Sequence, residues 1–198
     1  MKKIFYYIAI VTILLGLSGC SGSVSNMQVA KVDISSIEPE KGKAKVVFMR
    51  PSSFGFAIQS SVFTIKDNNP SIIGIVAAKK KIGQDFEPGE HLFMVIGESA
   101  DFMSARLEAD ETYYALVTPR FGVWKARFSL KPLTSLELNS EEFKEWVTSA
   151  QTVESNNDTK IWAEANQQSI QSKYIEYYKD WMAKHEIERP RLIEYIKN

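Results

Sequence analysis

Three residues have side chains that most readily act as nucleophile, general base or metal ligand: Cys20, His91 and His185. The two histidines are far apart in the sequence, and neither has the HExxH pattern or another short-spaced partner that a zinc site requires. His91 opens a predicted strand after a tight turn, and His185 lies near the end of a predicted helix, where a cation suits the helix dipole. We therefore expect structural roles for both histidines, no metal and no cofactor.

Paired carboxylates are the other candidates for acid–base chemistry. Asp110 and Glu111 lie in a predicted turn, and Glu141 and Glu142 open a predicted helix, so each pair has a local structural role. A glycosidase needs two carboxylates that face one cleft, a placement that the sequence does not reveal. The sequence has no GxSxG nucleophile motif and no glycine-rich phosphate loop. We expect no enzyme, and a hydrolase with an unrecognised carboxylate site stays an alternative.

The single cysteine follows what we interpret as an export signal. Lys2 and Lys3 precede Ile4–Leu17, fourteen uncharged residues. As a helix they would span about 21 Å, which is too short for the ~30 Å hydrocarbon core of a membrane. Residues 1–19 are therefore predicted to be a secretory signal peptide. A lone cysteine cannot form an internal disulfide, so Cys20 needs another explanation.

Leu17-Ser18-Gly19-Cys20 resembles the processing box of bacterial lipoproteins. In that family the cysteine thiol receives a diacylglycerol, and the signal is cleaved before the cysteine, whose new amino group is usually acylated. The resemblance implies lipidation of Cys20 and a membrane partner held through this anchor. In enterobacterial lipoproteins an Asp after the cysteine favours retention at the inner membrane. Here Ser21 stands at that position, so the resemblance implies the outer membrane, on either its periplasmic or its surface side. An ordinary secretion signal is the alternative.

The processed chain is expected to have three parts. Residues 20–42, rich in Ser, Lys and Glu, are predicted to form a flexible tether, followed by a β-domain over 43–134 and an α-helical region over 135–198. Cleavage would remove Lys2 and Lys3 and leave 22 basic and 24 acidic residues, a net charge of −2. This balance gives no electrostatic reason to expect a nucleic-acid partner.

Short apolar runs separated by turn residues dominate the predicted β-domain. The runs include 44–49, 60–66, 71–78, 91–97, 102–109, 112–118 and 123–131. Alternating runs at spacings near ten residues are typical of an antiparallel sandwich. We predict an α+β protein whose antiparallel β-sandwich has about seven strands. Tyr113 and Tyr114 should point to opposite faces of their strand, so that one is in the core and the other can be exposed.

The C-terminal region has helical periodicity. A helix is predicted to begin near Asn139 or Ser140, and a long one to cover 159–186. The long one carries a stripe of Ile170, Tyr174, Tyr177 and Trp181. Tyr174, Tyr177 and Trp181 form either a core face or a partner surface, since aromatic residues dominate binding hot spots. After Pro190 a last short helix is expected.

The stretch 44–118 resembles a family of small bacterial lipoproteins known as domain-of-unknown-function family 2846. The features that carry the resemblance are KVVFMR, EPGEH and LEADETYYALV, with Asp110 where the family usually has Gly. The resemblance implies a β-sandwich-like domain related in style to PEGA-type surface modules and supplies no catalytic residues. We expect a non-enzymatic envelope module that binds or assembles a protein or a glycan, with a carbohydrate- or peptidoglycan-binding module as the alternative.

Overall fold

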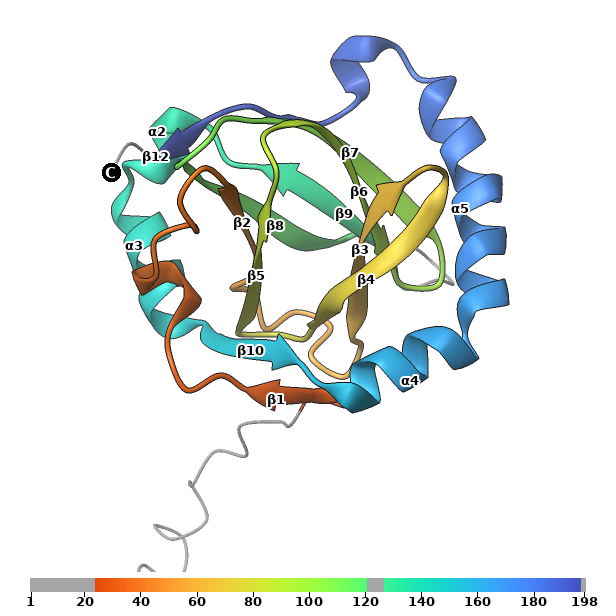
Figure 1. Cartoon of the computed structure of the whole chain (residues 1–198), viewed down its shortest axis with the longest axis horizontal. Coiled ribbons are helices and arrows are strands. Elements are labelled where there is room, and N and C mark those ends of the chain that lie inside the picture. Colours follow the sequence, from red (N-terminus) through yellow and green to blue (C-terminus); the bar gives the residue numbers. More distant parts are fainter. Residues whose placement is uncertain (1–23, 121–126, 197–198) are drawn as a thin grey trace, which may run out of the picture.

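The computed structural model describes residues 24–120 and 127–196, and it contains two β-sheets with four α-helices around them (Figure 1). The first sheet has seven strands in the order β1 (Met27–Val29), β10 (Gln151–Ser155), β5 (Lys80–Phe86), β2 (Ala44–Arg50), β8 (Thr112–Arg120) and β12 (Tyr195–Ile196), with β9 (Arg127–Pro132) also paired to β8. The second has five strands in the order β11 (Arg191–Leu192), β7 (Ala100–Leu107), β6 (Gly89–Ile96), β3 (Ser60–Lys66) and β4 (Asn69–Val76). The signal segment and Cys20 lie outside the described residues.

The α+β class is confirmed, but the sheets are mixed and not purely antiparallel. Parallel pairs join β2 to β8, β10 to β5 and β11 to β7. A hairpin joins two strands that are consecutive in the sequence and makes an antiparallel pair. Strands β2 and β8 are separated in the sequence by β3 to β7, so the chain can return to pair them in parallel. Segment 43–134 supplies β2 to β9, and further strands come from either side of it.

Strand β2 shows why the sheets pack together. All seven of its residues are buried, because β5 and β8 flank it and both of its faces are covered. Its Phe48 meets Phe93 of β6 edge to face, with ring centroids 5.1 Å apart. Tyr113 and Tyr114 of β8 are both buried, so the ring that could have been exposed is covered as well. Tyr114 packs against Phe143 of helix α3 (Glu141–Ser149), which covers the outer face of the first sheet.

The predicted helical region is only partly helical. Its helices are α2 (Ser135–Leu138), α3, α4 (Asn157–Ala165) and α5 (Gln167–Met182), followed by the 3-10 turn η2 (Glu186–Glu188). The long helix expected over 159–186 ends and restarts at Asn166, which is the C-cap of α4 and the N-cap of α5. The last helix expected after Pro190 is instead the short strands β11 and β12, which pair with β7 and β8. Strand β10 also interrupts the region.

The predicted tether is folded from Val24 onward. Val24 is 6% exposed, β1 pairs with β10, and the 3-10 turn η1 (Ile34–Ser36) lies against β5. The buried ammonium of Lys45 donates to the carbonyl oxygens of Ile37 and Glu38 at 3.0 and 2.8 Å. Residues 24–42 contain few apolar residues, and hydrogen bonds to their backbone carbonyls leave no pattern in the sequence. The prediction of a flexible tether through residue 42 is therefore wrong for residues 24–42.

An ion pair between Asp33 and Lys81 also fixes the N-terminal segment. Lys81 is fully buried and lies 2.8 Å from a carboxylate oxygen of Asp33. Burial acts to raise the pKa of Asp33. Hydrogen bonds from Lys81, the Ser35 amide and Thr152 outweigh that effect and bring the pKa below its ordinary 3.8. The pair therefore stabilises the fold above pH 4 and loses this contribution as the pH falls below that value.

We expect Asp33→Asn to lower the free energy of unfolding at pH 7 by about 1 kcal/mol, because the half-exposed carboxylate is partly screened by solvent. The difference from the wild type should shrink at pH 3, below the ordinary pKa of aspartate, because the unfolded wild type then binds a proton that the folded state resists. Urea denaturation at both pH values measures it. Asp67→Asn, in the exposed turn between β3 and β4, is the control and should change little. A deficit that is as large at pH 3 as at pH 7 would contradict the assignment.

Candidate functional site

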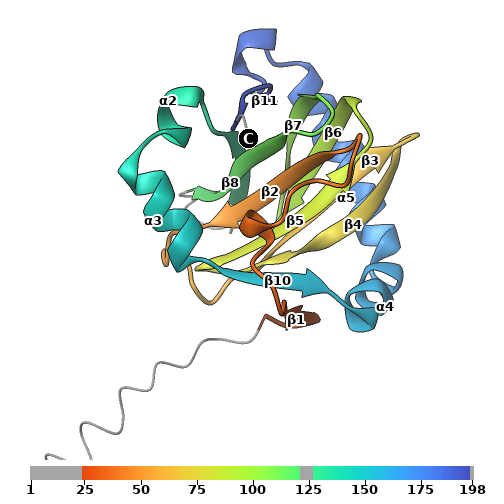
Figure 2. The same cartoon turned by 60° about the vertical axis from the view of Figure 1, so that its left-hand side comes forward.

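The predicted aromatic stripe belongs to the core of the protein. Tyr174 and Trp181 are each 5% exposed, and they pack with Phe102 of β7, to which their ring centroids lie at 6.1 and 6.0 Å. Tyr177 is half-buried at the edge of the same cluster. Helix α5 lies along the outer face of the second sheet (Figure 2), so the stripe is turned toward the strands. These residues hold the helix in place and do not form a free surface.

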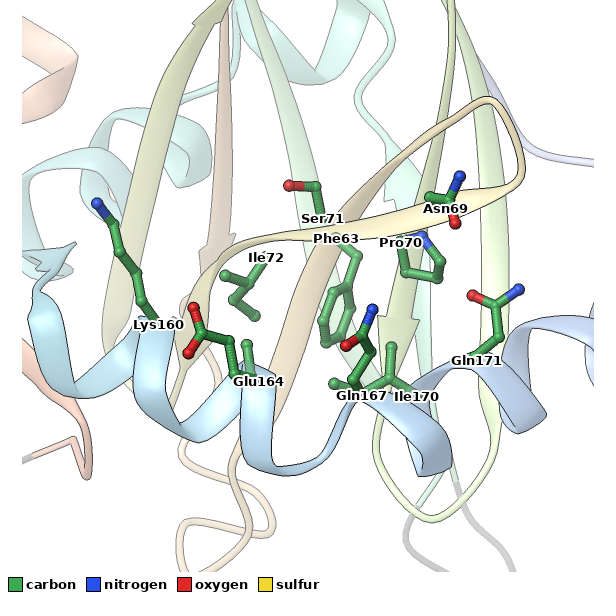
Figure 3. A pocket seen from close by; sticks show the side chains of 11 residues that line it. Phe63, Asn69, Pro70, Ser71, Ile72, Lys160, Glu164, Gln167, Ile170 and Gln171 are labelled. Carbon is green, nitrogen blue, oxygen red and sulfur yellow. The ribbon is translucent and has the colours of Figure 1, made fainter.

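A groove lies instead between strand β4 and the two helices α4 and α5 (Figure 3). Its volume is about 350 Å³. The lining residues are Phe63, Asn69, Pro70, Ser71, Ile72, Lys160, Ala163, Glu164, Gln167, Ile170 and Gln171. Apolar side chains of Phe63, Ile72 and Ile170 form the floor, and polar side chains from the helices and from β4 form the two rims. Such a lining suits a ligand that has both apolar side chains and many hydrogen-bonding groups.

Strand β4 is the edge of the second sheet, and in the described part of the chain no other strand pairs with its outer side. Asp67 and Asn68, with φ of 51° and 63°, form a two-residue turn to β3. Lys66 and Asn69 form the hydrogen-bonded pair that closes this turn, and non-bonded and bonded pairs alternate from there as far as Phe63 and Ile72, beyond which the register shifts. The backbone groups of Pro70 and Ile72 therefore point away from β3.

The outer edge of β4 has an open part and a covered part. Farther along the strand, the carbonyl of Ile73 accepts from the hydroxyl of Ser155 at 2.6 Å, and the amide of Ile75 meets the sulfur of Met27 at 3.3 Å. These contacts come from β10 and β1 and close that half of the edge. The half beside the groove offers the carbonyl of Pro70 and both backbone groups of Ile72. Proline fits at position 70 because the N–H that it lacks would point outward.

Helix α5 fixes the width of the groove by binding the β3–β4 turn. The hydroxyl of Tyr174 donates to the side-chain oxygen of Asn68 at 3.0 Å, and the amide of Gln171 donates to the Asn68 carbonyl at 3.2 Å. Burial raises the pKa of Tyr174, so the phenol stays protonated and remains a donor at neutral pH. The buried stripe thus positions the groove without lining it at Tyr174, Tyr177 or Trp181.

The groove has little acid–base chemistry. Its charged side chains are Lys160 and Glu164, and it holds one carboxylate. Among residues 24–120 and 127–196, no group of three His, Cys, Asp or Glu side chains is placed to hold a metal ion. His91 faces the carbonyl of Glu87 at 2.7 Å and stacks on Phe93, and His185 precedes η2.

The carboxylate pairs occupy structural positions. The side chain of Asp110 accepts from the amide of Gly42 at 2.6 Å, and Glu141 pairs with Lys144 at 2.7 Å. Asp110 has a φ of 64°, a left-handed conformation that favours glycine. Neither pair lies in the groove.

One residue in the sequence, Pro70, marks β4 as an edge strand. The predicted run 71–78 begins after Pro70, whereas β4 begins at Asn69 and includes Pro70. A proline within a strand indicates an edge strand, because it cannot donate to a neighbour. The helices that complete the groove could not be placed beside this edge from periodicity alone.

No family model matches the chain, and no curated protein matches it. Among solved structures, it is similar to a protein from Eubacterium rectale determined by NMR, with 8% sequence identity and a TM-score of 0.29. That match covers 48% of this chain and 92% of the other. In the described part of the chain, no helix has both the length and the apolar character to cross a membrane.

Proposed function

We propose that the protein is a lipid-anchored, non-enzymatic module of the bacterial outer membrane that holds an extended peptide segment of an envelope partner in the β4–α4–α5 groove. The peptide would add as a strand to the open half of β4, with its alternate side chains over the apolar floor. Main-chain hydrogen bonds give affinity in this mode, and side-chain pockets give specificity.

The open backbone edge beside the groove is the observation that carries the proposal. The carbonyl of Pro70 and the amide and carbonyl of Ile72 need partners that an extended chain supplies in the correct spacing. The facing helices add amide side chains from Gln167 and Gln171 as further donors and acceptors.

A peptide suits this groove better than the two alternative ligands do. A sugar ring stacks on an exposed aromatic face, but the one aromatic residue of the groove, Phe63, is 1% exposed. A hydrolase with paired carboxylates needs a second acid beside Glu164, which the groove lining does not supply.

The proposed anchor depends on the sequence alone. Cys20 follows the signal-like segment in a lipoprotein-type box, and Ser21 follows it in the pattern that favours the outer membrane. The described domain starts at Val24, four residues after the cysteine, so an acylated Cys20 would hold the domain directly at the membrane.

A random-peptide phage library panned on the purified domain tests the groove. We expect enriched peptides whose synthetic forms bind, and whose binding is lost on N-methylation of alternate residues while the intervening positions tolerate it. Ala163→Arg, which fills the groove, should weaken binding at least about tenfold, a loss of ~1.4 kcal/mol. Ile161→Arg, on the exposed side of the same helix, is the matched control and should bind normally.

The pattern of N-methylation distinguishes strand addition from other binding modes. Peptides that bind equally well when any position is methylated would contradict addition to the β4 edge. Equal binding by Ala163→Arg and Ile161→Arg would place the binding site elsewhere on the molecule.

A further inference from the structure

The loop between β2 and β3 displays a cluster of large apolar side chains. Within residues 51–59, Phe54 is 51% exposed, Phe56 is 78% exposed and Ile58 is 42% exposed. Isolated exposed apolar residues are ordinary on a protein surface, but three within five positions form a patch that indicates a binding surface. We name Phe54, Phe56 and Ile58 the apolar loop.

The exposure of this loop is imposed by a buried cation. The guanidinium of Arg50, which is fully buried, donates to the carbonyl oxygens of Ile58 at 2.6 Å, Phe54 at 2.8 Å and Gly55 at 2.7 Å. Gly55 has a φ of 65°, a conformation open to glycine, which lets the chain turn around the guanidinium. The guanidinium thus fixes the backbone of the loop, on which Phe54, Phe56 and Ile58 remain largely exposed.

The apolar loop lies at the end of the domain from which the chain leads back to Cys20. In both views the loop and β1 lie at the lower end of the domain, and η2, coloured blue, lies at the upper end (Figures 1 and 2). Four Cα–Cα steps separate Cys20 from Val24, so these two residues are at most about 15 Å apart. Since Val24 is packed into the fold, a lipidated Cys20 would keep this end of the domain close to the bilayer.

We propose that the apolar loop inserts into the surface of the membrane that holds the anchor. The inference rests on the lipidation of Cys20 in the proposed function and adds a second, non-covalent contact with lipid. Phe and Ile side chains on a restrained loop gain free energy when they are buried at the boundary between headgroups and acyl chains. Two points of attachment would fix the orientation of the domain, with η2 directed away from the membrane.

A fluorescent probe beside the apolar loop tests this contact in the full-length, processed protein. If Cys20 is converted to a thioether, Ala57→Cys introduces a single free thiol and leaves Phe54, Phe56 and Ile58 intact. Ile187→Cys in η2, where the native side chain is 95% exposed, is the matched control. Each variant is labelled with nitrobenzoxadiazole and reconstituted into phosphatidylethanolamine–phosphatidylglycerol vesicles with or without spin-labelled lipid.

We expect emission from position 57 to shift to shorter wavelength and to be quenched by spin-labelled lipid at least about twofold more than emission from position 187. Adding Phe56→Ser and Ile58→Ser to the Ala57→Cys variant should remove the difference. Equal quenching at both positions in a protein whose mass shows acylated Cys20 would overturn the inference and leave the anchor standing.

Two other outcomes also overturn it. A mass spectrum without acyl groups on Cys20 would contradict both the anchor and the insertion that rests on it. A probe at position 57 that becomes shielded only as protein concentration rises, without quenching by lipid, would assign the apolar loop to contacts between copies of this chain.

Discussion

Arg50→Met should destabilise the fold by about 3–5 kcal/mol, because it removes a fully buried cation that makes three hydrogen bonds to carbonyl oxygens. The guanidinium also lies 4.8 Å from the ring centroid of Phe128, a cation–π contact that methionine cannot reproduce. Burial lowers the pKa of Arg50, but a guanidinium keeps its charge throughout the range in which proteins fold. The loss is a large part of a typical stability of about 5–15 kcal/mol.

Thermal and urea unfolding of Arg50→Met measure this effect. Arg106→Met is the matched control, since Arg106 is exposed on β7 and the substitution is identical. The control should stay within about 0.5 kcal/mol of the wild type. Arg50→Lys should fall between the two, because one ammonium keeps the charge but lacks the planar fork that reaches three carbonyls. Equal stability of Arg50→Met and Arg106→Met would show that the loop carbonyls are satisfied without the guanidinium.

Local signals in the sequence predicted the strands well and their partners poorly. The runs predicted over 44–49, 60–66 and 91–97 correspond to β2, β3 and β6. The run KVVFMR was expected to be a strand of an antiparallel sandwich, yet it is a central strand with a parallel neighbour. Its continuous apolar character is typical of a strand that is covered on both faces. One face of β2 packs against the second sheet and the other against α2 and α3.

The C-terminal half shows where local preference gives way to tertiary contacts. Helical periodicity correctly placed α3, where the Ser140 cap and the apolar spacing agree, and most of α5, which has apolar spacing but no side-chain cap. It failed after Pro190, where RLIEYIK has helix-forming residues but pairs with β7 and β8 as two short strands. The hydrogen bonds that these residues gain from an existing sheet edge are invisible in their own sequence.

The candidate groove was largely beyond the reach of the sequence for the same reason. Its two walls come from residues about a hundred positions apart, and its edge depends on β4 remaining the last strand of the second sheet. The aromatic residues of α5 were recognised as one stripe, but the choice between a core face and a partner surface required the position of the sheet. Because Tyr174 and Trp181 are buried, they pack α5 against the sheet, and Tyr174 also binds the β3–β4 turn beside the groove.

Trp181→Ala should therefore lower the free energy of unfolding by about 3–5 kcal/mol, as expected when a large buried aromatic side chain leaves a cavity. The ring packs against Phe102 and Tyr178 with centroids 6.0 and 5.9 Å away, and Arg189 lies over it at 5.3 Å. Its buried indole N–H has no hydrogen-bond partner among the described residues. Phenylalanine fills part of the same space and removes this unpaired donor, so Trp181→Phe should cost less than about 2 kcal/mol.

Chemical denaturation of the two Trp181 variants tests this ranking, with Tyr177→Ala at the edge of the cluster as the control, expected at about 1 kcal/mol. A peptide selected on the wild-type groove should still bind Trp181→Phe, because residue 181 does not line the groove. If Trp181→Ala unfolded no more easily than Tyr177→Ala but lost a partner in the envelope, the stripe would be a binding surface after all. Because Tyr174 and Trp181 are buried between α5 and β7, we expect Trp181→Ala to lower the stability of the fold more than Tyr177→Ala does. A buried side chain stabilises the folded state and is not accessible to a partner.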